Sequence, residues 1–260
     1  MTAHDFTTFY FAKIDVPVVL EAHKFYVSEA TKRLLAQFSD IEREAQEAEA
    51  QYLERSNRNF DPDRDDPGAA FEEAYQEGVG RWIALTEMQN TVTLALTAGM
   101  YHQFDKALRE KAVMEFSHWI DRKIISPVIW NLDFLRLIQL LEWLGMEIHG
   151  RDFFSTLDVC RLVANVYKHG DGVAHRELSS MFPEYYYRFK TEDSPWFTPH
   201  HENLTVTEAQ FVEFADAIAA FWINIPERCL SSQLRETPKW LESEVKNQEK
   251  RLAKLNSKAP

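Results

Sequence analysis

Five polar side chains fall on one face of a predicted helix that ends at residue 169. They are Asp158, Arg161, Asn165, Lys168 and His169. At about 100° per residue these positions span an arc of roughly 100°, and the apolar residues between them lie outside it. A histidine can move a proton, and a cation can stabilise charge on a phosphate. The same pattern is also typical of the solvated side of an amphipathic helix, whose cationic last turn suits the helix dipole.

The end of this helix resembles the signature of the HEPN superfamily, a group of small helical domains. The resemblance rests on Asn165 and His169, with Lys168 beside them and residues 170–172 as the glycine-containing exit. Many HEPN proteins are metal-independent ribonucleases of toxin–antitoxin and phage-defence systems. The resemblance therefore implies that RNA is the substrate and that the reaction needs no cofactor.

A second stretch, residues 96–108, resembles the HEPN helix that presents an acidic residue to the same site. Asp105 is that acid here. The resemblance implies an HEPN-like core over about residues 70–225 and a site in which Asp105 faces Arg161, Asn165, Lys168 and His169. Spacing alone offers another interpretation of Asp105, as an exposed ion pair with Arg109 four residues later.

The sequence departs from the family pattern at Ala164. The pattern places an arginine directly before the polar residue, whereas the nearest arginine here is Arg161, about two helical turns before His169. Ribonuclease chemistry needs a base for the ribose hydroxyl, an acid for the leaving oxygen and a cation at the phosphate. His169 suits the first role, and Arg161, Lys168 and Asn165 suit the last.

Two functions follow from these residues. The first is a metal-independent endoribonuclease effector of the toxin or phage-defence type, built as a homodimer because HEPN proteins face their motifs across a dimer interface. The alternative is a non-catalytic HEPN-like binding or scaffolding module that acts through a protein or nucleotide partner. The displaced arginine favours the module, and the surviving Asn165, Lys168 and His169 favour the enzyme.

A further group of histidines could suggest a metal site. His200 and His201 are adjacent, with His175 and Glu202 near them in the sequence. Adjacent histidines are expected to point apart, and no His-x-x-x-His spacing is present. The sequence therefore predicts no metal ion. Glycine-rich phosphate loops are also absent, so a P-loop ATPase or a Rossmann enzyme is not expected.

The elements that must position these residues are predicted to be helices. Glycine and proline are sparse, and no run of alternating apolar and polar residues indicates a strand. We expect a single all-α domain, a helical bundle with a long antiparallel hairpin. Its N-terminal helix covers residues 17–58 and pairs with a second long helix over 69–111. A buried helix covers 127–146, and a C-terminal helix covers 238–255.

Composition bounds the class of protein. The chain has 260 residues and a formal net charge of −12, which argues against a surface that coats DNA phosphates. Residues 239–258 are the only long net-basic stretch, typical of a solvated helix and also able to contact RNA. The segment 127–146 contains Asp133, Arg136, Gln139 and Glu142 and is too polar to span a membrane.

The two cysteines indicate a reducing environment. Cys160 and Cys229 are too few for a disulfide framework, so no disulfide is expected, and Cys160 is predicted to be a packed core thiol. The N-terminus has no basic region followed by an apolar run, so no signal peptide is predicted. These features favour a cytoplasmic protein.

Overall fold

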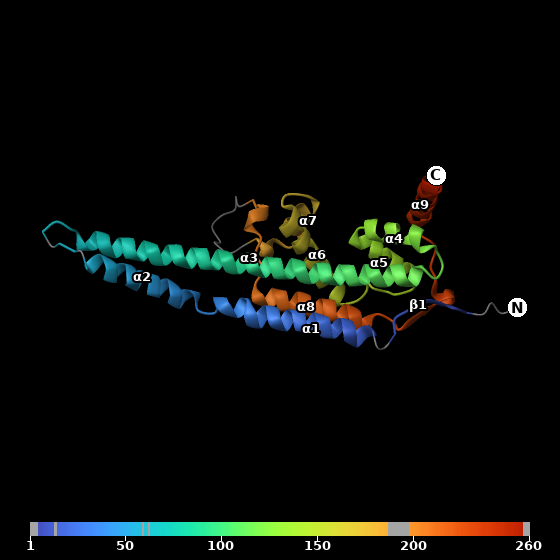
Figure 1. Cartoon of the computed structure of the whole chain (residues 1–260), viewed down its shortest axis with the longest axis horizontal. Coiled ribbons are helices and arrows are strands. Elements are labelled where there is room, and N and C mark those ends of the chain that lie inside the picture. Colours follow the sequence, from blue (N-terminus) through green and yellow to red (C-terminus); the bar gives the residue numbers. More distant parts are fainter. Residues whose placement is uncertain (1–4, 13–14, 59, 62, 187–197, 257–260) are drawn as a thin grey trace. The chain divides into compact units, whose positions relative to one another are not determined.

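The computed structural model describes residues 5–12, 15–58, 60–61, 63–186 and 198–256, and nine α-helices dominate this part of the chain (Figure 1). The helices are α1 (Asp15–Arg33), α2 (Ile41–Asn57), α3 (Pro67–Phe116), α4 (Arg122–Asn131), α5 (Phe134–Trp143), α6 (Phe153–His169), α7 (Val173–Met181), α8 (Glu208–Asn224) and α9 (Lys239–Asn256). Two short strands, β1 (Thr7–Tyr10) and β2 (Arg228–Leu230), pair antiparallel. The predicted all-α class is confirmed. Within the described ranges no helix is long and apolar enough to cross a membrane.

Contacts between residues divide the chain into two compact units. One unit, which we call the terminal unit, consists of Met1–Phe25, Gly99–Arg161 and Glu213–Pro260. The other, which we call the hairpin unit, consists of Tyr26–Ala98 and Leu162–Val212. Each unit is built from segments far apart in the sequence, so neither is a continuous piece of the chain.

The hairpin unit contains the antiparallel pair of long helices predicted from the sequence. Near the turn between α2 and α3, Tyr52 Oη donates a hydrogen bond to Glu73 Oε2 at 2.7 Å. Farther along, Arg81 Nη2 lies 3.0 Å from Glu44 Oε2. Because one residue number falls as the other rises, the two helices run in opposite directions (Figure 1). The prediction of a long helical hairpin is confirmed.

The stretch expected to be one helix over 17–58 is divided into α1 and α2. Between them lies the 3-10 turn η1 (Leu35–Phe38), in which the backbone N–H groups bond three residues back rather than four. The tighter turn buries Leu35, and Asp40 precedes α2 in a non-helical conformation. All these residue types are compatible with a helix, so local propensity does not reveal the break.

The segment 127–146, also expected as one helix, is α4 followed by α5. Leu132 is extended, and Asp133 caps α5 because its Oδ1 accepts a hydrogen bond from Arg136 N at 2.8 Å. An aspartate in an apolar run is therefore a helix start here. In contrast, the expected helices at 69–111 and 238–255 are present as α3 and α9, with α3 longer at both ends.

The terminal unit has an aromatic core. The ring of Phe104 meets the rings of Phe221 and Trp222 edge-on, with centroids 5.0 and 5.6 Å apart. Phe11, just after β1, stacks on Trp222 at 5.7 Å. All four rings are buried. They join the end of β1 to α3 and α8 by apolar contact, which is the main stabilising term in such a core.

A buried ion pair on α3 lies beside this core. Lys111 Nζ is 2.8 Å from Glu115 Oε1, and both side chains are almost inaccessible to water. Glu115 Oε2 also accepts a hydrogen bond from the backbone N–H of Tyr10 at 2.9 Å, which ties β1 to the helix. The lysine ammonium lies over the rings of Phe9 and Phe11. Each charge is thus compensated where water is excluded.

Candidate functional site

The polar segment predicted from the sequence is the helix α6. Its apolar side is core, since Leu157, Leu162 and Val163 are fully buried. The helix ends where predicted, because Gly170 follows His169 with a φ of +67°, a conformation that glycine adopts without strain. The amphipathic pattern therefore identifies both the helix and its last turn.

Arg161 pairs with a neighbour on its own helix. Its Nε donates to Asp158 Oδ1 at 2.6 Å, and the arginine side chain is largely buried. Both residues belong to the terminal unit. The guanidinium of Arg161 therefore neutralises the partly exposed carboxylate of Asp158.

Asp105 forms two hydrogen bonds with Arg109, at 2.7 and 3.0 Å. The buried guanidinium of Arg109 also donates to the carbonyl oxygens of Ile129 and Leu132, at 2.7 and 2.9 Å. These carbonyls lie at the C-terminal end of α4, where helical carbonyls lack partners within the helix. The alternative of an exposed Asp105–Arg109 pair is wrong, because the arginine side chain is buried and the aspartate is only partly exposed.

Asn165, Lys168 and His169 form the last turn of α6 and belong to the hairpin unit. Lys168 and His169 are exposed, and Asn165 is half-buried. Their side chains make no hydrogen bond or ion pair with any residue that the structure describes. They are accessible to a ligand. That Asn165, Lys168 and His169 work together in one site with Asp105 and Arg161 stays a prediction.

Ala164, where the family pattern has an arginine, has no exposed surface. It lies on the core side of α6 between Val163 and Asn165. A larger side chain there would have to displace packed neighbours. The departure from the HEPN pattern is therefore built into the packing of this helix.

Cys160 is fully buried on α6, and its burial raises the pKa of the thiol well above the ordinary value. Burial also raises the pKa of Cys229 to about 11. Both cysteines are free, as predicted. Since the thiolate is the reactive form, neither residue is a nucleophile at neutral pH, and the interpretation of Cys160 as a core thiol is confirmed.

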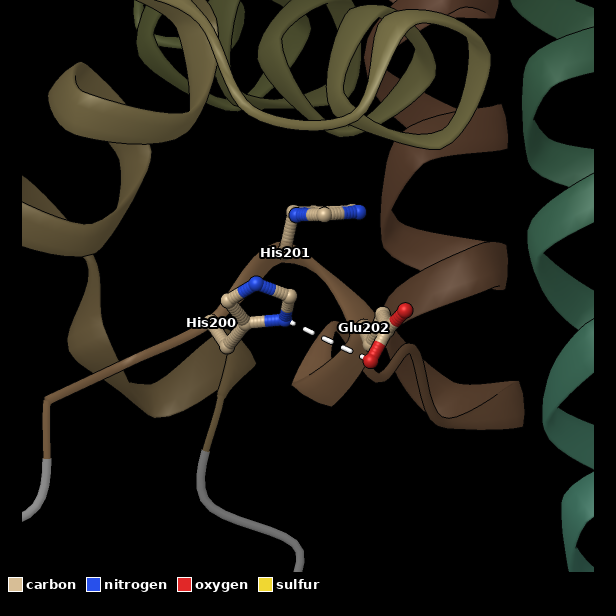
Figure 2. A group of neighbouring side chains, drawn as sticks. All are labelled: His200, His201 and Glu202. Atoms are coloured by element: carbon tan, nitrogen blue, oxygen red, sulfur yellow. Dashed lines mark ion pairs between the residues drawn. The ribbon is translucent and has the colours of Figure 1, made fainter.

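A different group of side chains converges just before α8. Figure 2 shows His200, His201 and Glu202 around the start of the 3-10 turn η3 (His201–Asn203). One possible ligand atom from each residue lies within 4.8 Å of the others. The Nδ1 atom of His200 is 3.5 Å from Glu202 Oε2, and the two imidazole centroids are 4.3 Å apart.

The expectation that the adjacent histidines point apart is wrong. His200 has an extended backbone, with φ −106° and ψ 149°, while His201 begins the 3-10 turn. The chain therefore bends between them, and side chains that would alternate along a strand come to the same side. Asn203 fixes the bend, because its Oδ1 accepts a hydrogen bond from His200 N at 3.1 Å.

His201 is held against the turn that follows α6. A Cβ atom added at Gly170 would lie 3.2 Å from the imidazole Cδ2 and Nε2 atoms, which is tighter than ordinary contact, so a larger residue there would push the ring away. The Nδ1 atom of His201 is buried and has no hydrogen-bond partner among the described residues. A buried polar atom left unpaired costs about 1–3 kcal/mol, so a ligand that reached this ring nitrogen would recover that cost.

His175 lies next to this group. Its ring is 6.2 Å from that of His201, and its Nδ1 is 2.9 Å from Tyr186 Oη. Burial raises the pKa of Tyr186 to about 12, and its hydroxyl shares this hydrogen bond with the His175 ring. His175 therefore has a partner and supports its neighbour by packing.

Comparison of the chain with protein-family models, with curated proteins and with solved structures gives no match.

The packing around Ala164 gives a direct prediction. Ala164→Arg should lower the free energy of unfolding by about 3 kcal/mol or more, because it overpacks the helix and buries a charge without a partner. Urea unfolding followed by circular dichroism measures this change. Lys168→Arg on the same helix is the control and should shift stability by less than about 0.5 kcal/mol. An Ala164→Arg protein as stable as wild type would mean that position 164 has room for a large side chain.

Proposed function

We propose that this protein is a non-catalytic, HEPN-like helical binding module whose α2–α3 hairpin docks on a protein partner with a basic surface. The observation that carries the proposal is the charge of this hairpin. Residues 41–98 contain thirteen acidic and five basic residues, a formal charge of −8 out of −12 for the whole chain. Such a field attracts a cationic partner and increases its rate of association.

The basic side chains of the hairpin do not neutralise the surplus carboxylates, because each one already contacts a carboxylate or an aromatic ring nearby. Four arginines pair with carboxylates of the same region or its edge, and the fifth lies over a tyrosine ring. They are Arg43 with Asp40 and Glu47, Arg58 with Glu54, Arg64 with Asp65, Arg81 with Glu44, and Arg55 over Tyr52. The remaining carboxylates are a surplus that a partner can neutralise.

Exposed aromatic side chains accompany the charge. Phe71 and Tyr75 on α3 are 64% and 55% exposed, and Trp82 is partly exposed. At about 100° per residue the three side chains lie within an arc of roughly 40° on the helix. Aromatic side chains that lose water on binding supply much of the energy of protein interfaces, and surrounding charges select the partner.

A basic protein is favoured over two other occupants. Nucleic acid carries the same sign of charge as the hairpin and would be repelled. A symmetric contact between two copies would bring two acidic hairpins together, which like-charge repulsion also opposes. The proposal is further supported by the pairing of Asp105 with Arg109 and of Arg161 with Asp158, which engages two of the five predicted catalytic residues.

The hairpin proposal predicts binding of a cationic amphipathic probe. A fluorescent synthetic helix of lysine, arginine and leucine should bind the full chain, and raising the salt from low to high concentration should weaken binding because exposed charges are screened. Phe71→Ala and Tyr75→Ala should each weaken it about 10-fold or more. Fluorescence anisotropy gives the dissociation constants.

Two controls accompany this titration. The same peptide with glutamate in place of its cations should not bind. Phe25→Ala removes a side chain that is 69% exposed on α1, outside the hairpin pair, and should leave affinity unchanged. Affinity that is insensitive to Phe71→Ala and Tyr75→Ala would contradict the proposal, as would salt-reversible self-association of the chain alone, which would make a second copy the occupant.

The second candidate is a metal-independent ribonuclease acting as a homodimer, favoured by the exposed and unengaged His169 and Lys168. Purified protein would then cleave bulk RNA or tRNA without added metal, and His169→Ala would lower the rate by about 100-fold or more. Lys168→Gln would also slow cleavage, whereas His149→Ala, at an exposed histidine that precedes α6 and packs on Phe154 at the opposite end of this helix from His169, would not. Absence of cleavage, or a strict monomer in sedimentation at micromolar concentration, would remove this candidate.

A further inference from the structure

We propose that His200, His201 and Glu202 bind one divalent first-row transition-metal ion of the zinc class. The proposal is independent of the hairpin and its partner. It rests on the convergence of two imidazoles and one carboxylate in the hairpin unit, with one ligand atom from each within 4.8 Å of the others.

The kind of donor decides the kind of ion. Imidazole nitrogen with one carboxylate oxygen suits zinc, copper, nickel or cobalt, whereas magnesium and calcium prefer oxygen ligands throughout. Ligand atoms bound to a tetrahedral zinc ion lie about 3.3 Å apart, given zinc–ligand distances of about 2.0–2.1 Å. The observed spread of up to 4.8 Å is close to this, and rotation of side chains can close the difference.

The three residues are suited to such a closure because one is fixed and two can turn. The His201 ring packs against Gly170, and its buried Nδ1 has no hydrogen-bond partner in the described part of the chain. His200 is 59% exposed at its side chain and Glu202 is more exposed still, so both can rotate toward the fixed ring. A fixed first ligand reduces the entropy lost when the ion binds.

Three protein ligands leave at least one coordination position for water. Closed structural zinc sites use four protein ligands, whereas sites with two histidines and one glutamate keep a position open. The open position allows the ion to bind an anionic oxygen ligand or to lower the pKa of a bound water. His201 packs against Gly170, which directly follows the exposed His169 in the sequence, so an ion here would add positive charge near that end of α6.

Calorimetric titration of the full chain without a histidine tag tests the site, with zinc chloride in a non-chelating buffer. We expect one ion per chain. His200→Ala and Glu202→Gln should each weaken binding about 10- to 100-fold, and neither should unfold the protein because both side chains are exposed. Cobalt in place of zinc should give the visible absorption of a four-coordinate ion, and magnesium should not compete.

His149→Ala is the matched control. His149 is 48% exposed, and its Nδ1 is 3.2 Å from a carboxylate oxygen of Glu142, so it is a histidine–glutamate pair without a second histidine. Its loss should leave zinc binding unchanged. The proposal is overturned if zinc does not bind, if His200→Ala and Glu202→Gln leave the affinity unchanged, or if His149→Ala weakens it as much as they do.

Discussion

The terminal unit depends on the hydrogen bonds of one buried group, the guanidinium of Arg109. A charge in this position would be costly without partners, and it has four hydrogen bonds, two to Asp105 and two to the carbonyls of Ile129 and Leu132. It therefore joins α3 to the C-terminal end of α4. Farther along α3, the ion pair of Lys111 and Glu115 holds β1 through the hydrogen bond that Glu115 accepts from the backbone of Tyr10. The final third of this long helix thus carries two compensated ion pairs in the interior.

This use of charge constrains function. Asp105 cannot turn toward a substrate without leaving Arg109 unpaired on that side, and Arg161 is engaged by Asp158. Accessible ionisable groups are found instead at the last turn of α6, in the histidine cluster before α8 and on the acidic hairpin, among other exposed positions. Binding at these exposed groups would break no internal ion pair. Catalysis by the five residues predicted from the sequence would require Asp105 and Arg161 to leave their partners.

Sequence reasoning predicted the helices well where an apolar stripe was long. The 50-residue α3, the amphipathic α6 and its stop at Gly170 follow from spacing and from glycine's freedom at positive φ. It missed the breaks at Leu35 and Asp133, because tertiary burial overrides propensity in the first and a single capping side chain acts in the second.

The site was harder to predict for a related reason. Spacing on one helix places Asp105 four residues from Arg109 but says nothing of the carbonyls of α4, which come from another part of the chain. The histidine pair was visible in the sequence, yet a strand-like rule for adjacent side chains failed at a 3-10 turn. The first error concerns neighbours from a distant part of the chain, and the second concerns a local turn that the sequence pattern did not indicate.

A double-mutant cycle on Asp105 and Arg109 tests most directly whether this acid serves the fold. Asp105→Asn, Arg109→Met and the double variant would be unfolded in urea, with Arg43→Gln and Glu47→Gln as the cycle for an exposed pair of the same spacing. We predict a coupling energy of about 2–3 kcal/mol for the buried pair and less than about 0.5 kcal/mol for the exposed one. A coupling energy for Asp105 and Arg109 as small as that of the exposed pair would contradict the structural role and return Asp105 to the candidate site.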